Sequence, residues 1–456
     1  MSVLSLLLVS VAPANAMSLK TAVEKAVTEN PKIRAAQASR RATDRVLSQA
    51  KRRYLPEVSI DGDFGIEKVD KPQAFGVNDN DQWRNRKRIA LNIKQTLFDG
   101  FERANNVYES QARISAAAHK ILARSEVVAL NVIEAYIDVR RHDRLIWLAG
   151  ENVKRHRKLL EVVNTRVEGG KTSDGDLFQT RERLQAAIAL RSQIKLVRAA
   201  AAAKFKRSVG IGPRRLNSVK MARNPYRSSS EAITAAISKN SRLAALQDEI
   251  DSAGFRTDRS RSELFPVVTL EGSASRGEDL DGTNGRADEI KGMVVLRWKL
   301  IDGGVRRQRT EELTEREFVK VSEYDAAVRQ VGEEIEIAWS KIVEGGRQIA
   351  AKRRQLAETG KVVSSYRKEY EANKRSLLDV LDAENSRFAV EFDLSNANSI
   401  RLFSGYELLA QTGSLLPYLG IARPKGSEVD ESMFRSTKGS SSGSNMFKSF
   451  VIPPLR

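Results

Sequence analysis

Cysteine is absent from the 456 residues, which excludes disulfides, thiolate metal sites and cysteine nucleophiles. Histidine is almost as rare, and His119, His142 and His156 do not have the spacing of a metal-binding motif. The sequence also contains no phosphate-binding glycine loop, no nucleophile motif and no alternating strand–helix pattern. We therefore do not expect an enzyme, a cofactor or a structural metal.

Long apolar runs are lacking as well. After residue 16 no segment reaches about 18 consecutive apolar residues, which a transmembrane helix would need. A shorter apolar run, Val3–Ala12, precedes Ala14-Asn15-Ala16, which is typical of a cleavage site for export. The sequence thus predicts a signal peptide at residues 1–16 and an exported protein, which would be periplasmic, secreted or a β-barrel of an outer membrane.

Basic residues exceed acidic ones, with 77 Lys and Arg against 58 Asp and Glu and a formal net charge of +19. The two signs are interspersed, as on solvated helix faces, and the basic run Arg84–Arg88 contains no aromatic residue. This pattern does not favour nucleic acid as a partner.

The chain is an internal tandem repeat. "AVTENPKIRAAQ" around Asn30 resembles "AISKNSRLAALQ" around Asn240, and "QTLFDG" ending at Gly100 resembles "WKLIDG" ending at Gly303. From Gly100 and Gly303 onward, an offset of 203 residues persists for about 110 residues without an insertion. We place the first repeat at residues 17–213, a linker at 214–225 and the second repeat at 226–417. A Ser/Gly-rich tail at 418–456 is expected to be disordered.

Each repeat is expected to contain very long helices. No proline lies between Pro72 and Pro213 or between Pro266 and Pro417, so nothing interrupts a helix there. Apolar residues at alternating steps of three and four predict coiled-coil packing. In repeat one this stripe is Ile146, Ala149, Val153, His156, Leu160, Val163 and Val167. We interpret His156 as a tolerated polar residue of the core, and a pH sensor is the alternative.

Two short segments before each long helix alternate apolar and polar residues, which predicts β-strands. The two hairpins, at about 57–98 and 267–300, contain strands of nearly ten residues, the length of a tilted transmembrane strand. Four strands cannot close a barrel, and free strand edges are not tolerated in lipid. We therefore expect an α+β, mainly α, chain that contributes four strands to a 12-stranded barrel shared by three copies.

In their order, duplication and spacing, these motifs resemble the TolC-type outer-membrane efflux proteins over about residues 19–417. The motifs are Asn30-Pro31, Leu55-Pro56, Leu97–Gly100, Phe265-Pro266, Leu300–Gly303 and "YEANKRSLLDVLDAENS" from Tyr370. The resemblance implies a homotrimer in outer-membrane lipid, with the strand barrel continued by a long periplasmic α-helical barrel. It also implies a duct that passively conducts drugs or secreted proteins and meets a periplasmic adaptor (membrane fusion) protein and an inner-membrane transporter.

The long helices are expected to turn back at Gly169-Gly170 and at Asn373-Lys374, because Gly and Asn best accept a left-handed backbone conformation. Ser173–Asp176 and Ser376–Asp379 then have the spacing of helix starts. Helix capping alone is therefore one interpretation of these two aspartates.

Asp382 lies beyond the cap and has no acidic counterpart in repeat one. With threefold symmetry, Asp379 and Asp382 would form two rings of acids that favour cations and bind multivalent ones. The resemblance implies that these rings line a closed periplasmic entrance, which hydrogen bonds and a salt bridge of Asp176, Tyr370 and Arg375 hold shut. Repeat one lacks the tyrosine and the arginine, so the helical hairpin of repeat two is expected to be the mobile one.

Two other functions stay open on the residues alone. A soluble periplasmic coiled-coil binding protein would account for the helices but would leave apolar strand faces in water. An enzyme could use the paired carboxylates for acid–base work, although the motifs that usually accompany such a pair are missing. We favour the outer-membrane duct.

Overall fold

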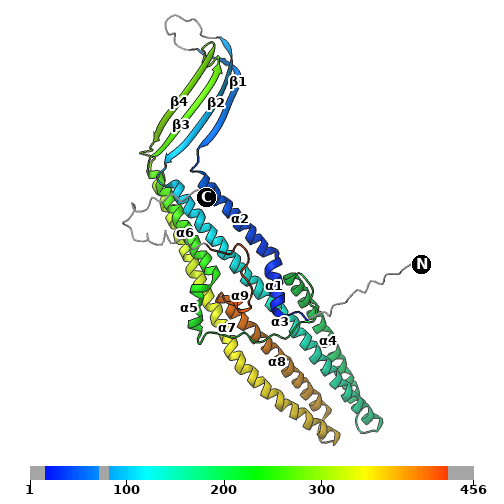
Figure 1. The fold of residues 1–456 in the computed structure, drawn as a ribbon. Helices are drawn as coiled ribbons and strands as arrows, with labels where there is room; N and C mark the ends of the chain where they lie inside the picture. Colours follow the sequence, from blue (N-terminus) through cyan, green and yellow to red (C-terminus); the bar gives the residue numbers. More distant parts are fainter. Residues whose placement is uncertain (1–15, 71–81, 430–456) are drawn as a thin grey trace, which may run out of the picture. The chain divides into compact units, whose positions relative to one another are not determined.

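The computed structural model describes residues 16–70 and 82–429, so the predicted signal peptide lies almost entirely outside it (Figure 1). The chain divides into two compact units. Unit 1 includes His119–Ala244 and Ala326–Ser427 together with the residues up to Gln37, and unit 2 includes Ala38–Ala118 and Ala245–Asp325. Within the described ranges, no helix has both the length and the hydrophobicity that crossing a membrane requires.

Both repeats follow the same order of elements: two helices, two strands, a very long helix and a returning helix (Figure 1). In repeat one these are α1 (Leu19–Glu29), α2 (Pro31–Arg52), β1 (Glu57–Lys68), β2 (Trp83–Phe98), α3 (Glu102–Glu168) and α4 (Asp174–Val209). In repeat two they are α5 (Ser229–Lys239), α6 (Ser241–Arg261), β3 (Val267–Glu278), β4 (Arg286–Arg297), α7 (Val305–Glu371) and α8 (Leu377–Gln411), with a 3-10 turn at Ser262–Leu264 and a final short helix, α9 (Leu415–Tyr418). The prediction of a mainly helical chain with four strands is confirmed.

The four strands of unit 2 form one antiparallel sheet in the order β1-β2-β3-β4. The register places Ile60 opposite Leu91, Leu91 opposite Ala274, and Ala274 opposite Ile290. Residues directly opposite each other share a face, so the apolar positions of all four strands gather on one side of the sheet. That side is open: the exposed fraction is 70% for Ile60 and 88% for Ile290.

The opposite face of the sheet is polar and internally paired. Asn92 donates to Asp61, Arg86 contacts Asp63 at 2.7 Å, and Arg297 contacts Glu271 at 3.0 Å. β1 and β4 each pair with one neighbour among the described strands, so one edge of each is unpaired within a single chain.

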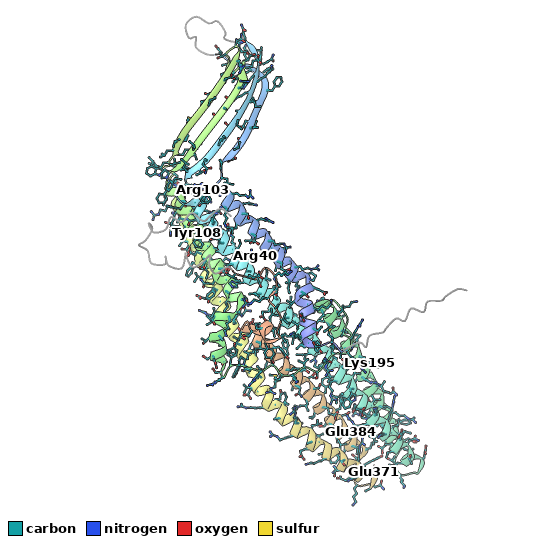
Figure 2. All side chains as sticks on the ribbon, viewed as in Figure 1. Arg40, Arg103, Tyr108, Lys195, Glu371 and Glu384 are labelled. Carbon is teal, nitrogen blue, oxygen red and sulfur yellow. The ribbon has the colours of Figure 1, made fainter. Side chains whose placement is uncertain are left out.

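The corner from strand to long helix is built in the same way in both repeats. Asp99 accepts hydrogen bonds from the backbone and guanidinium of Arg103, and Asp302 does the same for Arg306. Each aspartate thereby satisfies an N–H group at the start of a helix, and its arginine also donates to backbone oxygens nearby. The "LFDG" and "LIDG" motifs are thus the chemical signature of this corner (Arg103 is labelled in Figure 2).

The linker is fixed to both long hairpins of unit 1. Tyr136 of α3 is fully buried, and its hydroxyl donates to the carbonyl oxygens of Met17 and Asn217 at 2.7 and 2.9 Å. Tyr406 of α8 donates to the carbonyl oxygen of Lys220 at 2.9 Å. These bonds satisfy backbone groups that burial would otherwise leave unpaired.

The tail begins later than residue 418. Residues 418–429 belong to the structure, because Ile421 and Ser427 are buried and the Ile421 N–H bonds to the Leu416 carbonyl oxygen. The expectation of disorder from 418 onward was therefore wrong for this stretch, which follows a helix end and packs back on the fold. The Ser/Gly-rich part lies outside the described residues.

Candidate functional site

The turns that join α3 to α4 and α7 to α8 have the same backbone geometry. Gly170 and Asn373 have φ values of 65° and 59°, the left-handed conformation that the sequence predicts. In both turns the next amide, of Lys171 or Lys374, bonds at 2.8 Å to the carbonyl oxygen five residues earlier. This is the Schellman arrangement, which satisfies the free carbonyl groups at a helix end. Gly169 directly precedes Gly170, and its amide donates a hydrogen bond to the carbonyl oxygen of Thr165.

The returning helices begin with side-chain caps, as predicted. The Ser173 hydroxyl accepts from the Asp176 amide at 3.4 Å, and the Ser376 hydroxyl accepts from the Asp379 amide at 3.2 Å. Asp176 also accepts from the Thr172 hydroxyl, and Asp379 accepts from the Ser376 hydroxyl at 2.8 Å. Both aspartates therefore take part in a helix start, where the helix dipole favours negative charge.

Asp382 has a different environment from Asp379. Its side chain is exposed, and in the described part of the chain its carboxylate makes no hydrogen bond or ion pair. Asp379 is half-buried and lies 3.8 Å from the Arg375 guanidinium. The two carboxylates are three residues apart on α8 and so lie on neighbouring positions of one helix face. No group of three or more potential metal ligands occurs among the residues that the structure describes.

A single chain does not bring the three predicted latch residues together. Arg375 contacts Glu369 at 2.9 Å and stacks over the ring of Tyr366, 4.0 Å from its centroid. Hydrogen bonds from Ser365 and Arg375 lower the pKa of Glu369. Tyr370 is 5% exposed, and its hydroxyl has no hydrogen-bond partner among the described residues. Within the chain, Asp176 bonds to Thr172 and not to Tyr370 or Arg375.

Arg166, for which the sequence alone predicts no role, reaches from the first hairpin to the second. Its guanidinium donates to the Glu371 carbonyl oxygen at 3.1 Å and to the Asn373 side chain, and it lies 4.7 Å from the ring centroid of Tyr370. The offset of 203 pairs Arg166 with Glu369, which carries the opposite charge. The reversed charge at these equivalent positions indicates that the two turns make different side-chain contacts.

Next to Arg166, a group of apolar side chains, which we call the tip cluster, joins the two hairpins. Its buried members are Leu159, Val163, Leu177, Tyr370, Leu377, Val380 and Leu381. They come from α3, α4, α7 and α8, so each hairpin buries apolar side chains against the other.

A buried charge cluster lies beyond the tip cluster. Glu384 of α8 is 1% exposed and contacts Arg155 of α3 at 3.1 Å and Arg367 of α7 (Glu384 is labelled in Figure 2). Arg155 also reaches Glu391 at 3.1 Å. His156, at its predicted core position, is 2% exposed, and burial is the main cause that lowers its pKa. The cluster ties the second hairpin to α3.

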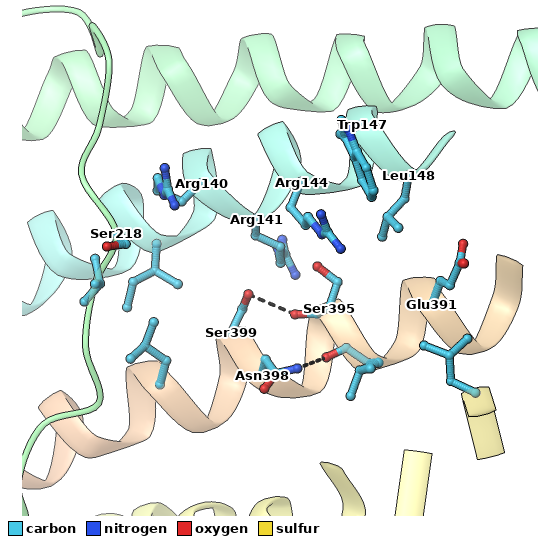
Figure 3. A pocket seen from close by; sticks show the side chains of 15 residues that line it. Arg140, Arg141, Arg144, Trp147, Leu148, Ser218, Glu391, Ser395, Asn398 and Ser399 are labelled. Carbon is cyan, nitrogen blue, oxygen red and sulfur yellow. Dashed lines mark hydrogen bonds between the residues drawn. The ribbon is translucent and has the colours of Figure 1, made fainter. Parts of the chain in front are cut away.

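A cavity of about 400 Å³ lies farther along α3 and α8, beside the linker (Figure 3). Three arginines face it, and each already has a contact. Arg140 donates to the Leu216 carbonyl oxygen at 2.8 Å, Arg141 donates to Asp138, and Arg144 stacks on Trp147. The cavity is separate from the tips, and the Arg140 bond belongs to the anchoring of the linker.

A family model, sequence relatives and solved structures all relate this chain to outer-membrane proteins. The model of a family described as outer membrane efflux protein matches residues 22–210 and 232–414. The chain is 24% identical over 399 residues to the outer membrane efflux protein BepC of Brucella suis biovar 1 (strain 1330), covering 87% of this chain and 86% of that one. It is 22% identical over 419 residues to the outer membrane protein TolC of Vibrio cholerae serotype O1, covering 88% and 91%. The crystal structure of the outer membrane protein VceC from Vibrio cholerae has the same fold, with a TM-score of 0.74 at 17% identity over 89% of this chain and 97% of that one.

Proposed function

Because the chain belongs to the outer membrane efflux protein family, we propose that its hairpin tips form the closable periplasmic entrance of an export duct. The protein is an outer-membrane efflux channel of a tripartite system, with a helical extension into the periplasm. Channels of this family assemble into oligomers and work with an adaptor and an inner-membrane transporter. The soluble coiled-coil binding protein is not favoured.

We infer that the functional unit is a trimer that shares one barrel. The single sheet has an unpaired edge on β1 and on β4, and unpaired backbone groups are costly in lipid. Three copies would supply twelve strands, an even number that closes without edges. The open apolar face of the sheet would then contact lipid, and the charged face would line the lumen.

One substitution on the sheet separates these two faces. Ile60→Arg should lower the amount of trimer in the outer-membrane fraction severalfold, because an arginine on the lipid face costs about 2–4 kcal/mol near the bilayer midplane. Ser59→Arg is the matched control, since Ser59 is the preceding residue on the polar face and lies opposite Asn92. Equal losses in the two variants would contradict the assignment of the faces.

The entrance is proposed to carry two rings of acids, from Asp379 and Asp382. The observation that carries this is Asp382, an exposed carboxylate without a counter-charge beside a helix start whose other polar groups are satisfied. Rings of carboxylates in a narrow pore favour cations. Asp176, Tyr370 and Arg375 would form the latch between neighbouring copies, which agrees with the free hydroxyl of the buried Tyr370.

Purification and single-channel recording test the function. The full chain, extracted with detergent, should be a trimer and should form cation-preferring pores in planar bilayers. Extraction as a monomer without detergent would refute the duct. Drugs and secreted proteins are both proposed cargoes, and crosslinking in cells followed by identification of the inner-membrane transporter would decide between them.

A further inference from the structure

The cavity beside the linker lies between α3 and α8, with Leu356 of α7 also on its wall (Figure 3). Three arginines and one glutamate line it. The glutamate, Glu391, already has two counter-charges, because it contacts Arg155 at 3.1 Å and Arg387 at 3.2 Å. The one acid on the wall therefore does not neutralise the three arginines of the cavity.

Two of these arginines have no acidic partner within the described ranges. Arg141 pairs with Asp138, whereas Arg140 donates at 2.8 Å to a backbone oxygen of the linker, which leaves its charge uncompensated. Arg144 makes no hydrogen bond or ion pair with any described residue. The cavity thus contains positive charge without a counter-charge, which favours an anion as its occupant.

Arg144 is held in an orientation that suits binding. Its guanidinium lies 4.1 Å from the ring centroid of Trp147, three residues farther along α3. Stacking covers one face of the guanidinium and leaves the N–H groups at its edge free to donate. Figure 3 shows Arg144 pointing from α3 toward Ser395 of α8, whose hydroxyl makes no hydrogen bond in the described part of the chain. Free donors from two helices therefore face one cavity, an arrangement that suits the two acceptor oxygens of a carboxylate.

The equivalent arginine of repeat two is neutralised. The offset of 203 pairs Arg144 with Arg347, which contacts Glu344 at 2.6 Å. Glu344 stands at the position equivalent to Arg141, and Ala350 stands where repeat one has the stacked tryptophan. The unpaired and stacked arginine is therefore a property of repeat one alone and not of the fold that both repeats share.

The rest of the wall is largely apolar. Leucine and valine side chains from α3, α7, α8 and the linker face the cavity: Leu148, Val219, Leu356, Leu394 and Leu402. Its volume of about 400 Å³ falls in the range of small-molecule sites, roughly 300–1,000 Å³. An inorganic anion would leave this apolar surface in water, whereas an organic anion would cover it.

We propose that the cavity binds a small organic anion, a carboxylate with an apolar body. The carboxylate accepts hydrogen bonds from Arg144 and Ser395, and the apolar body packs against the leucines and the ring of Trp147. This site goes beyond the proposed duct, because it lies away from the hairpin tips and needs residues of one chain only. A bound anion contacts α3, α8 and the linker together and so stabilises their packing.

Titration calorimetry with naphthoate, on the full chain in lipid nanodiscs, tests the site. One molecule should bind per chain, and the neutral naphthamide should bind about tenfold more weakly because it lacks the charge. Arg144→Gln should weaken naphthoate binding about tenfold without loss of folding, since Arg144 makes no hydrogen bond or ion pair. Arg347→Gln is the matched control, because it removes the equivalent arginine on α7, and it should bind naphthoate as the wild type does.

Hydrogen exchange gives a second readout. Naphthoate should slow amide exchange in residues 214–225 and 395–402 of the wild type but not of Arg144→Gln. Absence of naphthoate binding, or binding that survives Arg144→Gln, would overturn the proposal. Equal affinity for naphthamide would make the cavity an apolar groove, and equal affinity for inorganic phosphate would contradict the role of the apolar wall. These outcomes leave pore formation untouched, so they are distinguishable from a failure of the duct.

Discussion

Replacing Asp379 and Asp382 together by alanine is expected to abolish the cation preference of the pore and its block by trivalent cations. Two unit charges about 8 Å apart in water interact by about 0.5 kcal/mol. A trivalent cation near three carboxylates makes nine such unit pairs, so one ring contributes about 4–5 kcal/mol, or roughly 1000-fold in affinity before salt screening. Planar-bilayer recordings with a trivalent complex ion, at low and high salt, would measure the loss.

The control for this prediction is Ser376→Ala. It removes the hydroxyl that caps α8 and bonds to Asp379, but it leaves both acids in place. Its pore should remain cation-selective and open to block. If Ser376→Ala reproduced the alanine pair, the two aspartates would be helix-start residues and not pore acids. The single substitution Asp382→Ala should by itself lower the cation selectivity of the pore, because this carboxylate is exposed, unpaired and not part of the helix cap.

The second large effect is expected at Glu384. Glu384→Gln keeps the shape of the side chain but removes the buried charge that Arg155 and Arg367 share; both arginines are partly exposed, and Arg155 keeps its contact with Glu391. Removing one partner of a fully buried ion pair costs about 3–5 kcal/mol, and the partial exposure of the two arginines lowers the expected loss of stability to about 2–3 kcal/mol. The denaturant concentration at which the helices unfold, measured by circular dichroism, should therefore fall. The second hairpin should also become more accessible to protease.

Asp393→Asn is the matched control for this loss. It removes one charge from the same helix, but the partner is Lys352 of α7, 2.9 Å away, and the Asp393 side chain is 56% exposed. An exposed pair contributes at most about 1 kcal/mol. Equal effects of the two substitutions would mean that the Glu384 cluster does not tie the hairpins together.

The tie at Glu384 bears on how the entrance opens. The absence of counterparts to Tyr370 and Arg375 in repeat one predicts that the hairpin of repeat two is the mobile one. In the structure, Arg166, the tip cluster and Glu384 all join that hairpin to the first within one chain. If the hairpin moves alone, these contacts must break, so their loss should raise the open probability of the channel.

Local features of the tips were predictable from the sequence. The left-handed turn residues and the serine caps depend on a few neighbouring residues, and the same turn and the same cap occur in each repeat. Contacts between the hairpins were harder to predict, because they join residues about 200 positions apart. One signal was available: Leu377, Leu381, Glu384 and Phe388 continue an apolar stripe in steps of four, three and four, with an acid inside it. An acid in such a position indicates a buried partner.

The internal repeat has a consequence for how the proposed trimer can evolve, because three copies would place six similar hairpins around one axis. In a ring of six identical half-length chains, each substitution would appear six times, and no position could differ from its neighbour. Fusion of two halves into one chain lets alternate positions drift apart, as Arg166 and Glu369 have, while corner residues such as Asp99 and Asp302 stay alike. In the proposed trimer, a mutation in the fused gene would therefore alter every second hairpin of the ring, so that one set could specialise while the other maintains closure.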